Sequence, residues 1–477
     1  MCGRARCLSK CGKQRARPLK WKQNHFSLQG GMFMAIPITP QLIRKKLFDV
    51  IHRMADNIED FVRHPGHDFT RKRRCTFPRM LIGIMSMESH DLDGEILSVF
   101  TCGKKNIKRE NLVTSSAFVQ SRGKINDSAF PTLFHEFNQK FPFTKTKDGI
   151  HIFALDGSDV NVPADKKDCN TFIPYNSNKG GYHQMHINLC FSILDQRYTD
   201  VVIQPRSKMK EADAACSMVD NNTVKGKSLY IADRGYESFN LMAHIMEKGD
   251  YFLIRLKDVF GKASPCRGIA PGPDMEFDIS SEFLITRSRS MKKQDPTKIK
   301  VISKSRRFDF IPEDDKKSTY RIPFRLVAIQ LDTGTYEYLI TNLPEKKYPA
   351  SILKDYYHKR WTIETSFLFL KYGVALNYFH SIRRDFLCQE IYAKLIIFNF
   401  ISLLVSCVRL SSGGNTKYTY KVSFSDAIST GRLFLLNNIR SVDVIPLLEF
   451  HKTPERPDRK ARRKLDSQKL KTLQHRT

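Results

Sequence analysis

Residues 351–373 read SILKDYYHKRWTIETSFLFLKYG, a stretch with no proline and with glycine only at its last position. This composition predicts a helix of about five turns. Within it, Tyr357, Arg360, Glu364 and Lys371 stand at offsets of 0, 3, 7 and 14 residues. At about 100° per residue, these four side chains fall within a stripe roughly 60° wide. One edge of the helix therefore carries a phenol, two cations and one carboxylate.

Three large apolar side chains flank this stripe, those of Trp361, Phe367 and Leu368. Taken alone, a polar stripe of this kind is also typical of the solvated face of an amphipathic helix. Apolar groups beside it instead indicate partial burial, and a partly buried carboxylate among cations needs a specific reason. Glu364 is therefore a candidate functional residue.

Two more carboxylates follow apolar runs upstream. In DGIHIFALDGSD (148–159), Asp156 closes a predicted strand and is followed by a predicted glycine turn. In KSLYIADRGY (227–236), Asp233 closes a second, buried strand. Each motif taken singly is also a common turn sequence. Because strand ends in α/β folds place side chains at the rim where ligands bind, we expect the two aspartates to meet Glu364 there.

The order of predicted elements around these motifs indicates the fold. Residues 146–256 give three strands, a helix, a strand, a helix and a strand, and residues 350–385 supply the helix that completes the set. This order predicts an α/β protein with an RNase H-like mixed-sheet core. Residues 257–349 are rich in Gly, Pro and Lys and then strand-like, so we expect a β-rich insertion between the two parts of the core.

Both ends of the chain are predicted to lie outside this core. Residues 1–31 are basic with few large apolar residues, which indicates a disordered extension. Residues 32–145 have helical periodicity, and two short helices around Gly123 suit a helix-turn-helix-like DNA-binding region, with a plain helical bundle as the alternative. Residues 386–477 predict a helical region that begins with a strongly apolar helix and ends in a basic tail.

Charge points to the kind of partner. The chain carries 79 Lys and Arg against 49 Asp and Glu, a net charge of +30. This sign favours nucleic acid or an anionic membrane surface. The apolar run at 395–405 is shorter than the roughly 20 residues of a membrane span, so we expect DNA rather than a membrane. Eleven cysteines without a CxxC pair favour a reducing cytoplasm.

The histidines and glycines give little sign of other cofactors. His183 and His186 in GYHQMH lie on opposite faces of a predicted strand, which favours packing or hydrogen bonding over a zinc site. The sequence has no P-loop and no Rossmann glycine pattern, so it does not indicate a bound ATP or NAD.

One family shares the motifs described so far. The spacing of Tyr357, Arg360, Glu364 and Lys371 matches the Y-(2)-R-(3)-E-(6)-K signature of the insertion-sequence-four family of DDE transposases. The motifs ALDGSD and YIADRGY resemble the first and second acidic motifs of that family, which also carries a β-rich insertion at the same point. The resemblance covers roughly residues 40–385 in order.

The resemblance implies a reaction and its metal ions. Asp156, Asp233 and Glu364 would ligate two Mg²⁺ ions, for which Mn²⁺ can substitute. The protein would bind terminal inverted repeats of a transposon, cut the DNA strands there and transfer them to target DNA in a cut-and-paste reaction. It would act as a homodimer in the synaptic complex, in the cytoplasm and at the bacterial nucleoid when bound to DNA.

The resemblance also implies the DNA contacts. Tyr357 and Arg360 would contact a transposon-end phosphate, and Lys371 the DNA backbone near the cut. Arg and Lys suit phosphate, the first as a planar fork and the second as a point charge. Arg234 either adds to this DNA-facing edge or pairs with Asp159.

Family members that cut through a DNA hairpin are expected to hold a flipped base against a tryptophan in the β insertion. The two tryptophans of this chain, Trp21 and Trp361, both lie outside that insertion. Tyr336, Tyr338 and Phe324 are the candidates to stack a base instead, since any aromatic face can do so.

Two other functions remain open from the residues. One is a former transposase that still binds DNA but no longer cuts it, and the other is an RNase H-like nuclease acting on RNA or junctions. The helix near 391–407 is the candidate dimer surface, although a core helix would have the same composition.

Overall fold

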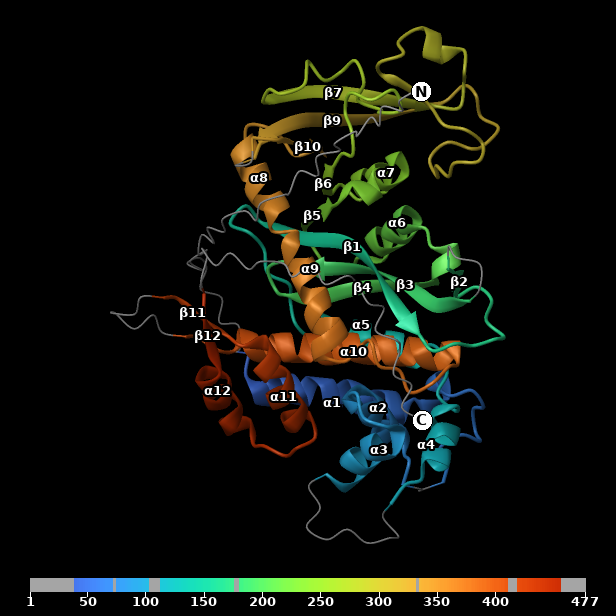
Figure 1. The fold of residues 1–477 in the computed structure, drawn as a ribbon, viewed down its shortest axis with the longest axis vertical. Helices are drawn as coiled ribbons and strands as arrows, with labels where there is room; N and C mark the ends of the chain where they lie inside the picture. The colour runs from blue at the N-terminus through green and yellow to red at the C-terminus, as the bar shows by residue number, and fades with distance from the viewer. Residues whose placement is uncertain are drawn as a thin grey trace, which may run out of the picture.

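The computed structural model describes residues 38–71, 74–102, 112–175, 180–331, 334–410 and 418–455. The predicted disordered extension and nearly all of the basic tail lie outside these ranges. In the described part of the chain, a ten-stranded sheet runs through the molecule, and a layer of helices closes one end of it (Figure 1).

The central part of the sheet has the order β4, β3, β1, β5, β6. Its strands are β1 (Ile150–Val162), β3 (Gly181–Ser192), β4 (Arg197–Pro205), β5 (Lys227–Ala232) and β6 (Tyr251–Arg255), with the short β2 (Phe172–Pro174) beside β3. β1, β3 and β4 pair antiparallel, whereas β1, β5 and β6 are parallel. Helices α6 (Glu211–Asn221) and α7 (Phe239–Glu247) connect β4 to β5 and β5 to β6. The predicted RNase H-like α/β fold class is confirmed.

The insertion extends this same sheet. Its strands are β7 (Phe277–Thr286), β8 (Ile299–Val301), β9 (Thr319–Gln330) and β10 (Tyr336–Thr341). β10 pairs antiparallel with β6, and β9, β7 and β8 follow it outward to the far edge (Figure 1). The insertion therefore covers the edge of β6, whose unpaired backbone groups would otherwise face solvent.

β1 differs from the predicted strand. It runs on through Asp156 and Gly157 to Val162, because the antiparallel pairing with β3 continues along its whole second half. The predicted turn at Gly157 is therefore wrong. The parallel pairing with β5, in contrast, ends at Leu155 opposite Ala232. Asp156, on β1, and Asp233, the residue after β5, are therefore the first residues beyond the last parallel pair.

The predicted five-turn helix is divided into three pieces. These are α8 (Ala350–His358), α9 (Trp361–Leu368) and a π-helical turn, η6 (Phe369–Gly373). At the first junction the amide of Arg360 bonds the carbonyl of Tyr357 at 3.0 Å, a tighter spacing than in an α-helix. The wider π turn at the far end is of the kind often found at functional sites.

Helices from both ends of the chain form one layer. They are α1 (Pro40–Asp56), α2 (Phe77–Ser86), α3 (Leu92–Thr101), α4 (Ser115–Arg122), α5 (Ala129–Gln139), α10 (Arg384–Ser406), α11 (Phe424–Leu435) and α12 (Ser441–Phe450). A small separate sheet, β11 (Tyr420–Val422) with β12 (Lys452–Pro454), lies beside them. α10 runs along the side of this layer that faces the sheet and also packs on α1 and α2 (Figure 1).

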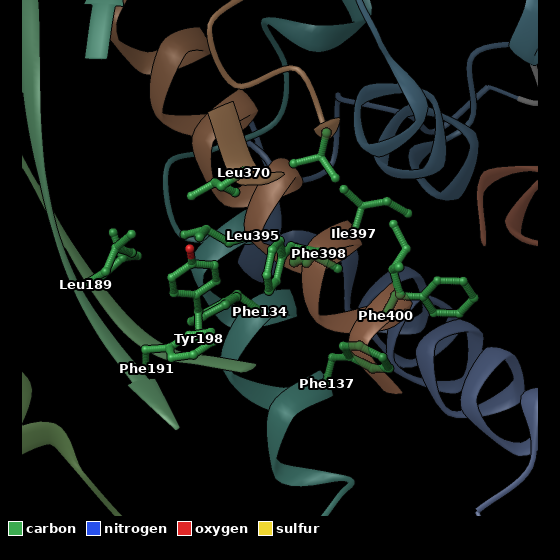
Figure 2. Packing of buried hydrophobic residues seen from close by; sticks show 14 of the residues in the cluster. Phe134, Phe137, Leu189, Phe191, Tyr198, Leu370, Leu395, Ile397, Phe398 and Phe400 are labelled. Atoms are coloured by element: carbon green, nitrogen blue, oxygen red, sulfur yellow. The ribbon is translucent and has the colours of Figure 1, made fainter. Parts of the chain in front are cut away.

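Aromatic side chains join α10 to the sheet. The ring of Tyr198 on β4 lies 4.9 Å from that of Phe398 on α10, and Phe191 on β3 lies 5.0 Å from Tyr198 (Figure 2). Among the described residues, α10 is the helix long and apolar enough to span a membrane, but most of it is buried within the protein. It is a core helix, so it does not offer the free dimer surface that its composition suggested.

The predicted helix-turn-helix also belongs to this core. Its second helix, α5, buries Phe130, Leu133, Phe134 and Phe137 against α1, α10 and β4. A recognition helix must leave its outward face free to enter a DNA groove. α5 keeps partly exposed residues on its other side, among them Thr132, His135 and Glu136, so its packing is compatible with both the helix-turn-helix and the plain helical bundle.

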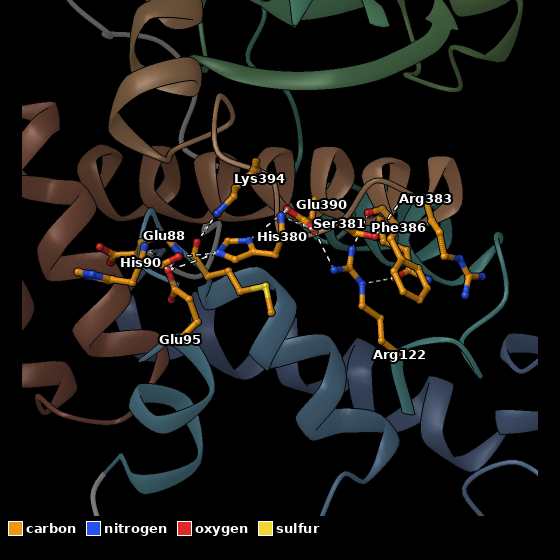
Figure 3. A network of polar contacts seen from close by, with 12 residues as sticks. Glu88, His90, Glu95, Arg122, His380, Ser381, Arg383, Phe386, Glu390 and Lys394 are labelled. Carbon is orange, nitrogen blue, oxygen red and sulfur yellow. Dashed lines mark hydrogen bonds and ion pairs between the residues drawn. The ribbon is translucent and has the colours of Figure 1, made fainter. Parts of the chain in front are cut away.

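A buried polar network joins α4 to α10. Arg122 of α4 lies 2.8 Å from Glu390 of α10, and both side chains are almost fully buried. His380, in the segment that leads into α10, pairs with the same carboxylate at 3.3 Å (Figure 3). Removing one partner of a buried pair leaves an uncompensated charge, so these contacts hold the helical layer in one arrangement.

Candidate active site

The alternation of side chains along β1 and β5 explains which face carries the site. Ile152 and Ala154 pack in the same core as α9 and α10, whereas Phe153 and Leu155 pack against α6 and α7. Side chains two residues apart share a face, so Asp156 lies on the α9 side. Leu229 and Ile231 of β5 also pack on the α9 side. Asp233, the residue that follows β5, is two positions after Ile231, so it lies on the α9 side as well.

Arg360 gathers the predicted carboxylates around one guanidinium. Its Nη2 lies 2.8 Å from Oε1 of Glu364, one helical turn further along α9. Its Nη1 lies 3.5 Å from Oδ2 of Asp156. Asp233 lies within the electrostatic reach of the same guanidinium. The structure thus brings together three acidic side chains that are far apart in the sequence.

Tyr357 connects the third carboxylate to the signature helix. Its hydroxyl donates to Oδ1 of Asp233 at 3.2 Å. The tyrosine is only 1% exposed, so its ring is part of the core and its polar tip faces the site. In this arrangement Tyr357 orients a carboxylate and does not present a free face to DNA.

Burial and charge act differently on the two aspartates. Burial raises the pKa of Asp156 to about 6, although the positive charge of Arg360 opposes it. Burial also acts on Asp233, but the backbone N–H of Arg234 and the cations Arg360 and Arg255 outweigh it, so the pKa of Asp233 is lowered. Paired titratable groups shifted in opposite directions are typical of functional sites.

The donor set suits divalent cations. Carboxylate oxygens are the ligands that Mg²⁺ and Mn²⁺ prefer. In the described part of the chain, no three His, Cys, Asp or Glu side chains lie close enough together to enclose a metal ion directly. The reason is local: the guanidinium of Arg360 occupies the space between Asp156 and Glu364. The residues fit a divalent cation in kind, and the position between them already binds a cation.

Two other predicted site residues, Lys371 and Arg234, differ in exposure. Lys371 donates to the backbone carbonyl of Asp159 at 2.7 Å, and burial lowers the pKa of its ammonium. Arg234 is exposed beside Asp233. The alternative prediction, that Arg234 pairs with Asp159, is wrong, because the arginine that pairs with Asp159 is Arg206, at 2.9 Å.

The aromatic candidates also separate. Phe324 is 3% exposed and packs on Phe283 at 4.2 Å, so its proposed role in base stacking is wrong. Tyr336 and Tyr338 on β10 are partly exposed. Trp361 is 40% exposed directly beside Arg360, on the helix that carries the signature.

Sequence reasoning missed several charged residues near the site. Glu337 on β10 is buried, with one carboxylate oxygen unpartnered and the other 3.5 Å from Arg255. His186 was predicted to be a hydrogen-bonding residue, and it is: its Nδ1 lies 2.7 Å from Asp159. Its other partner, Glu211 at 3.3 Å, starts α6 and had no local motif to identify it.

His186 is held in its charged form by these two partners. Burial alone would lower the pKa of His186, but Asp159 and Glu211 outweigh burial and raise it to about 9. A cation therefore lies behind the carboxylates at neutral pH.

Comparison with known proteins identifies the family of this chain. A family model described as the transposase DDE domain matches residues 147–400, more than half of the chain. The chain belongs to this family of DNA transposases. A search of curated proteins gives no match. Among solved structures, a cryo-EM structure of a piggyBac transposase synaptic complex with hairpin DNA is similar, with a TM-score of 0.43 and 10% sequence identity, over 84% of this chain and 81% of that chain.

Proposed function

We propose that the protein is a cut-and-paste DNA transposase of the insertion-sequence-four kind, which cuts at terminal inverted repeats and joins the freed ends to target DNA. The observation that carries this proposal is the meeting of Asp156, Asp233 and Glu364 around the signature helix. Three carboxylates from three elements are the usual donor set for a pair of metal ions in phosphoryl transfer.

The carboxylates and Arg360 have complementary roles in this proposal. Asp156, Asp233 and Glu364 would hold two Mg²⁺ ions, with Mn²⁺ as a substitute. Bound there, such ions supply activation of water or a 3′ hydroxyl and charge stabilisation at the leaving oxygen. Arg360 would then turn from the carboxylates to a DNA phosphate, for which a guanidinium offers a bidentate fork.

Neighbouring residues would position DNA on the same edge. Tyr357 keeps Asp233 oriented through its hydroxyl, and Lys371 and Arg234 add positive charge near the cut strand. Tyr336 is a candidate to stack a displaced base. Trp361, exposed on α9, is a further candidate that sequence reasoning did not consider for this role.

The rest of the chain would serve binding and assembly. The helical region at 32–145 would bind the terminal repeats, and the basic tail would add salt-sensitive affinity for any DNA. The active form would be a homodimer that pairs two transposon ends, in the cytoplasm of its host.

A cleavage assay tests the proposal. The substrate is DNA carrying the inverted repeats that flank the coding sequence, with Mg²⁺ added or removed by EDTA. We expect cuts at the repeat ends and transfer into a target plasmid, both lost in Asp233→Ala. The control Asp443→Ala removes an exposed carboxylate on α12, paired with Arg440, and should leave the activity unchanged.

The rival functions give other results in the same assay. Binding to repeat DNA without cuts, in wild type as in Asp233→Ala, would identify a DNA-binding protein that has lost its activity. Metal-dependent hydrolysis of RNA or junctions without strand transfer would identify a nuclease.

A further inference from the structure

Four charged side chains form a second polar cluster next to the candidate active site. Arg206 lies 2.9 Å from Asp159, which in turn lies 2.7 Å from Nδ1 of His186. Nε2 of His186 lies 3.3 Å from Oε1 of Glu211. Cations and anions thus alternate from the end of β4, across β1 and β3, to the first residue of α6.

This cluster lies on the other face of the sheet from the catalytic carboxylates. Asp156 shares its face with Ala154, which packs on the α9 side. The next position along β1, Gly157, faces the α6 side, like Leu155 before it. The carboxylate of Glu211 is therefore behind the strand that carries Asp156 and is not a fourth acid beside it.

Two glycines make room for the carboxylate of Glu211. A Cβ added at Gly157 would lie 2.5 Å from Nε2 of His186 and 3.1 Å from Oε1 of Glu211. A Cβ added at Gly235 would lie 3.0 Å from Oε2 of Glu211, with no other atom near it. These glycines follow Asp156 by one residue and Asp233 by two. Each oxygen of this carboxylate therefore lies where a side chain on one of the two segments that carry the aspartates would begin.

We propose that Glu211 is a positioning residue for the metal site: held by His186, its carboxylate fills the space between the segments after Asp156 and Asp233 and sets the distance between those two ligands. The inference rests on the proposed function, since that distance matters only if the aspartates share metal ions. Residues that orient metal ligands from behind typically change metal affinity about 10–100-fold when they are removed.

The far end of α6 provides a matched control. There, His244 lies between Asp220 and Asp309, 2.9 Å from each, in the same carboxylate–histidine–carboxylate arrangement. Asp220 is near the last residue of α6, as Glu211 is its first. Asp220→Ala thus removes a histidine-paired carboxylate from the same helix without touching the segments after the aspartates.

The test measures Mn²⁺ binding to the full chain without DNA, from the free Mn²⁺ signal in electron paramagnetic resonance. We expect wild type to bind Mn²⁺ and Asp233→Ala to lose that binding. Glu211→Ala should weaken binding by about tenfold or more. Glu211→Gln keeps the size of the side chain and should stay within a few-fold of wild type. Asp220→Ala should bind as wild type does.

Each result bears on the proposal. Equal weakening by Glu211→Ala and Glu211→Gln would mean that the negative charge of Glu211, and not the space that its side chain fills, supports metal binding. Normal binding by Glu211→Ala would mean that it positions nothing. Either result overturns the inference and leaves the proposed function standing. Binding that Asp233→Ala does not reduce would overturn both.

Gly235→Ala tests the same contact without making a cavity, so it applies even if Glu211→Ala does not fold. The new methyl group meets only Glu211, so Gly235→Ala as a single change should weaken Mn²⁺ binding. In a Glu211→Ala background the same change should cost nothing further, because its contact is gone. Additive effects of the two changes would contradict the positioning role.

Discussion

Nη2 of Arg360 lies 2.8 Å from Oε1 of Glu364, and this contact makes the signature arginine an internal counter-ion of the site. The same guanidinium reaches Asp156 on its other side. Without Arg360 and without metal ions, the carboxylates of Asp156, Asp233 and Glu364 would lie near one another with no cation between them. In the proposed function, a metal ion that binds between these carboxylates would replace Arg360, which would then be released towards DNA.

Arg360→Ala should therefore make stability depend on divalent cations. In EDTA, the loss of the guanidinium leaves Asp156 and Glu364 unpaired, and we expect a cost of about 1–3 kcal/mol. Added Mg²⁺ or Mn²⁺ should restore more stability to the variant than to wild type, because the cation no longer competes with Arg360. Urea unfolding with and without the metal measures this. An equal metal response in both proteins would rule out the exchange.

Glu364→Ala separates catalysis from DNA binding. The side chain of Glu364 is 37% exposed, and in the proposed function its loss removes a metal ligand but no cation. We expect cleavage to fall at least about 100-fold while binding to repeat DNA, measured by fluorescence anisotropy, stays within a few-fold of wild type. Equal loss of cleavage and binding would contradict the role of ligand.

Tyr357→Phe removes one oxygen from the site and little else. The lost hydroxyl leaves Asp233 without its side-chain donor, so we expect about 0.5–1.5 kcal/mol of lost stability. Cleavage should fall about tenfold, since Asp233 is less well oriented. The control is Tyr356→Phe, a buried neighbour on α8 whose ring faces Tyr348. The hydroxyl of Tyr356 bonds Thr146 instead of a carboxylate. A larger effect in this control would show that loss of a buried hydroxyl on α8, and not loss of the bond to Asp233, is being measured.

The candidate site was largely predictable because its residues lie in local patterns. The spacing of Tyr357, Arg360 and Glu364 is short enough for helix geometry to define, and apolar runs before Asp156 and Asp233 identify strands. Whether these residues come together depends on the register of β1 against β5. That register is set by pairing between distant segments, so no local sequence pattern predicts it.

Other features escaped prediction for the same reason. Gly157 looks like a turn residue, but pairing with β3 continues the strand, and the glycine is needed for the close approach of His186. Glu211 has no motif, since its partners come from β1 and β3. The sequence correctly predicted that α5 is a helix, but not that α1, α10 and β4 cover one face of it.

The Arg122–Glu390 pair predicts how stability depends on acidity. Burial opposes ionisation of Glu390, but Arg122 and His380 outweigh it and lower its pKa to about 2. A carboxyl group whose pKa is lower in the folded protein contributes its full stability above its unfolded pKa of about 4.5, and loses it as the pH falls towards 2.

Glu390→Gln should therefore destabilise the protein by about 3–5 kcal/mol at pH 7, where the pair is charged. This difference should shrink at pH 3.5, because wild type is then losing the same contribution. Urea unfolding of both proteins at the two pH values measures it, with Asp443→Asn, in an exposed ion pair on α12, as the control. A gap between wild type and Glu390→Gln that is the same at both pH values would mean that the charge on Glu390 does not stabilise the helical layer.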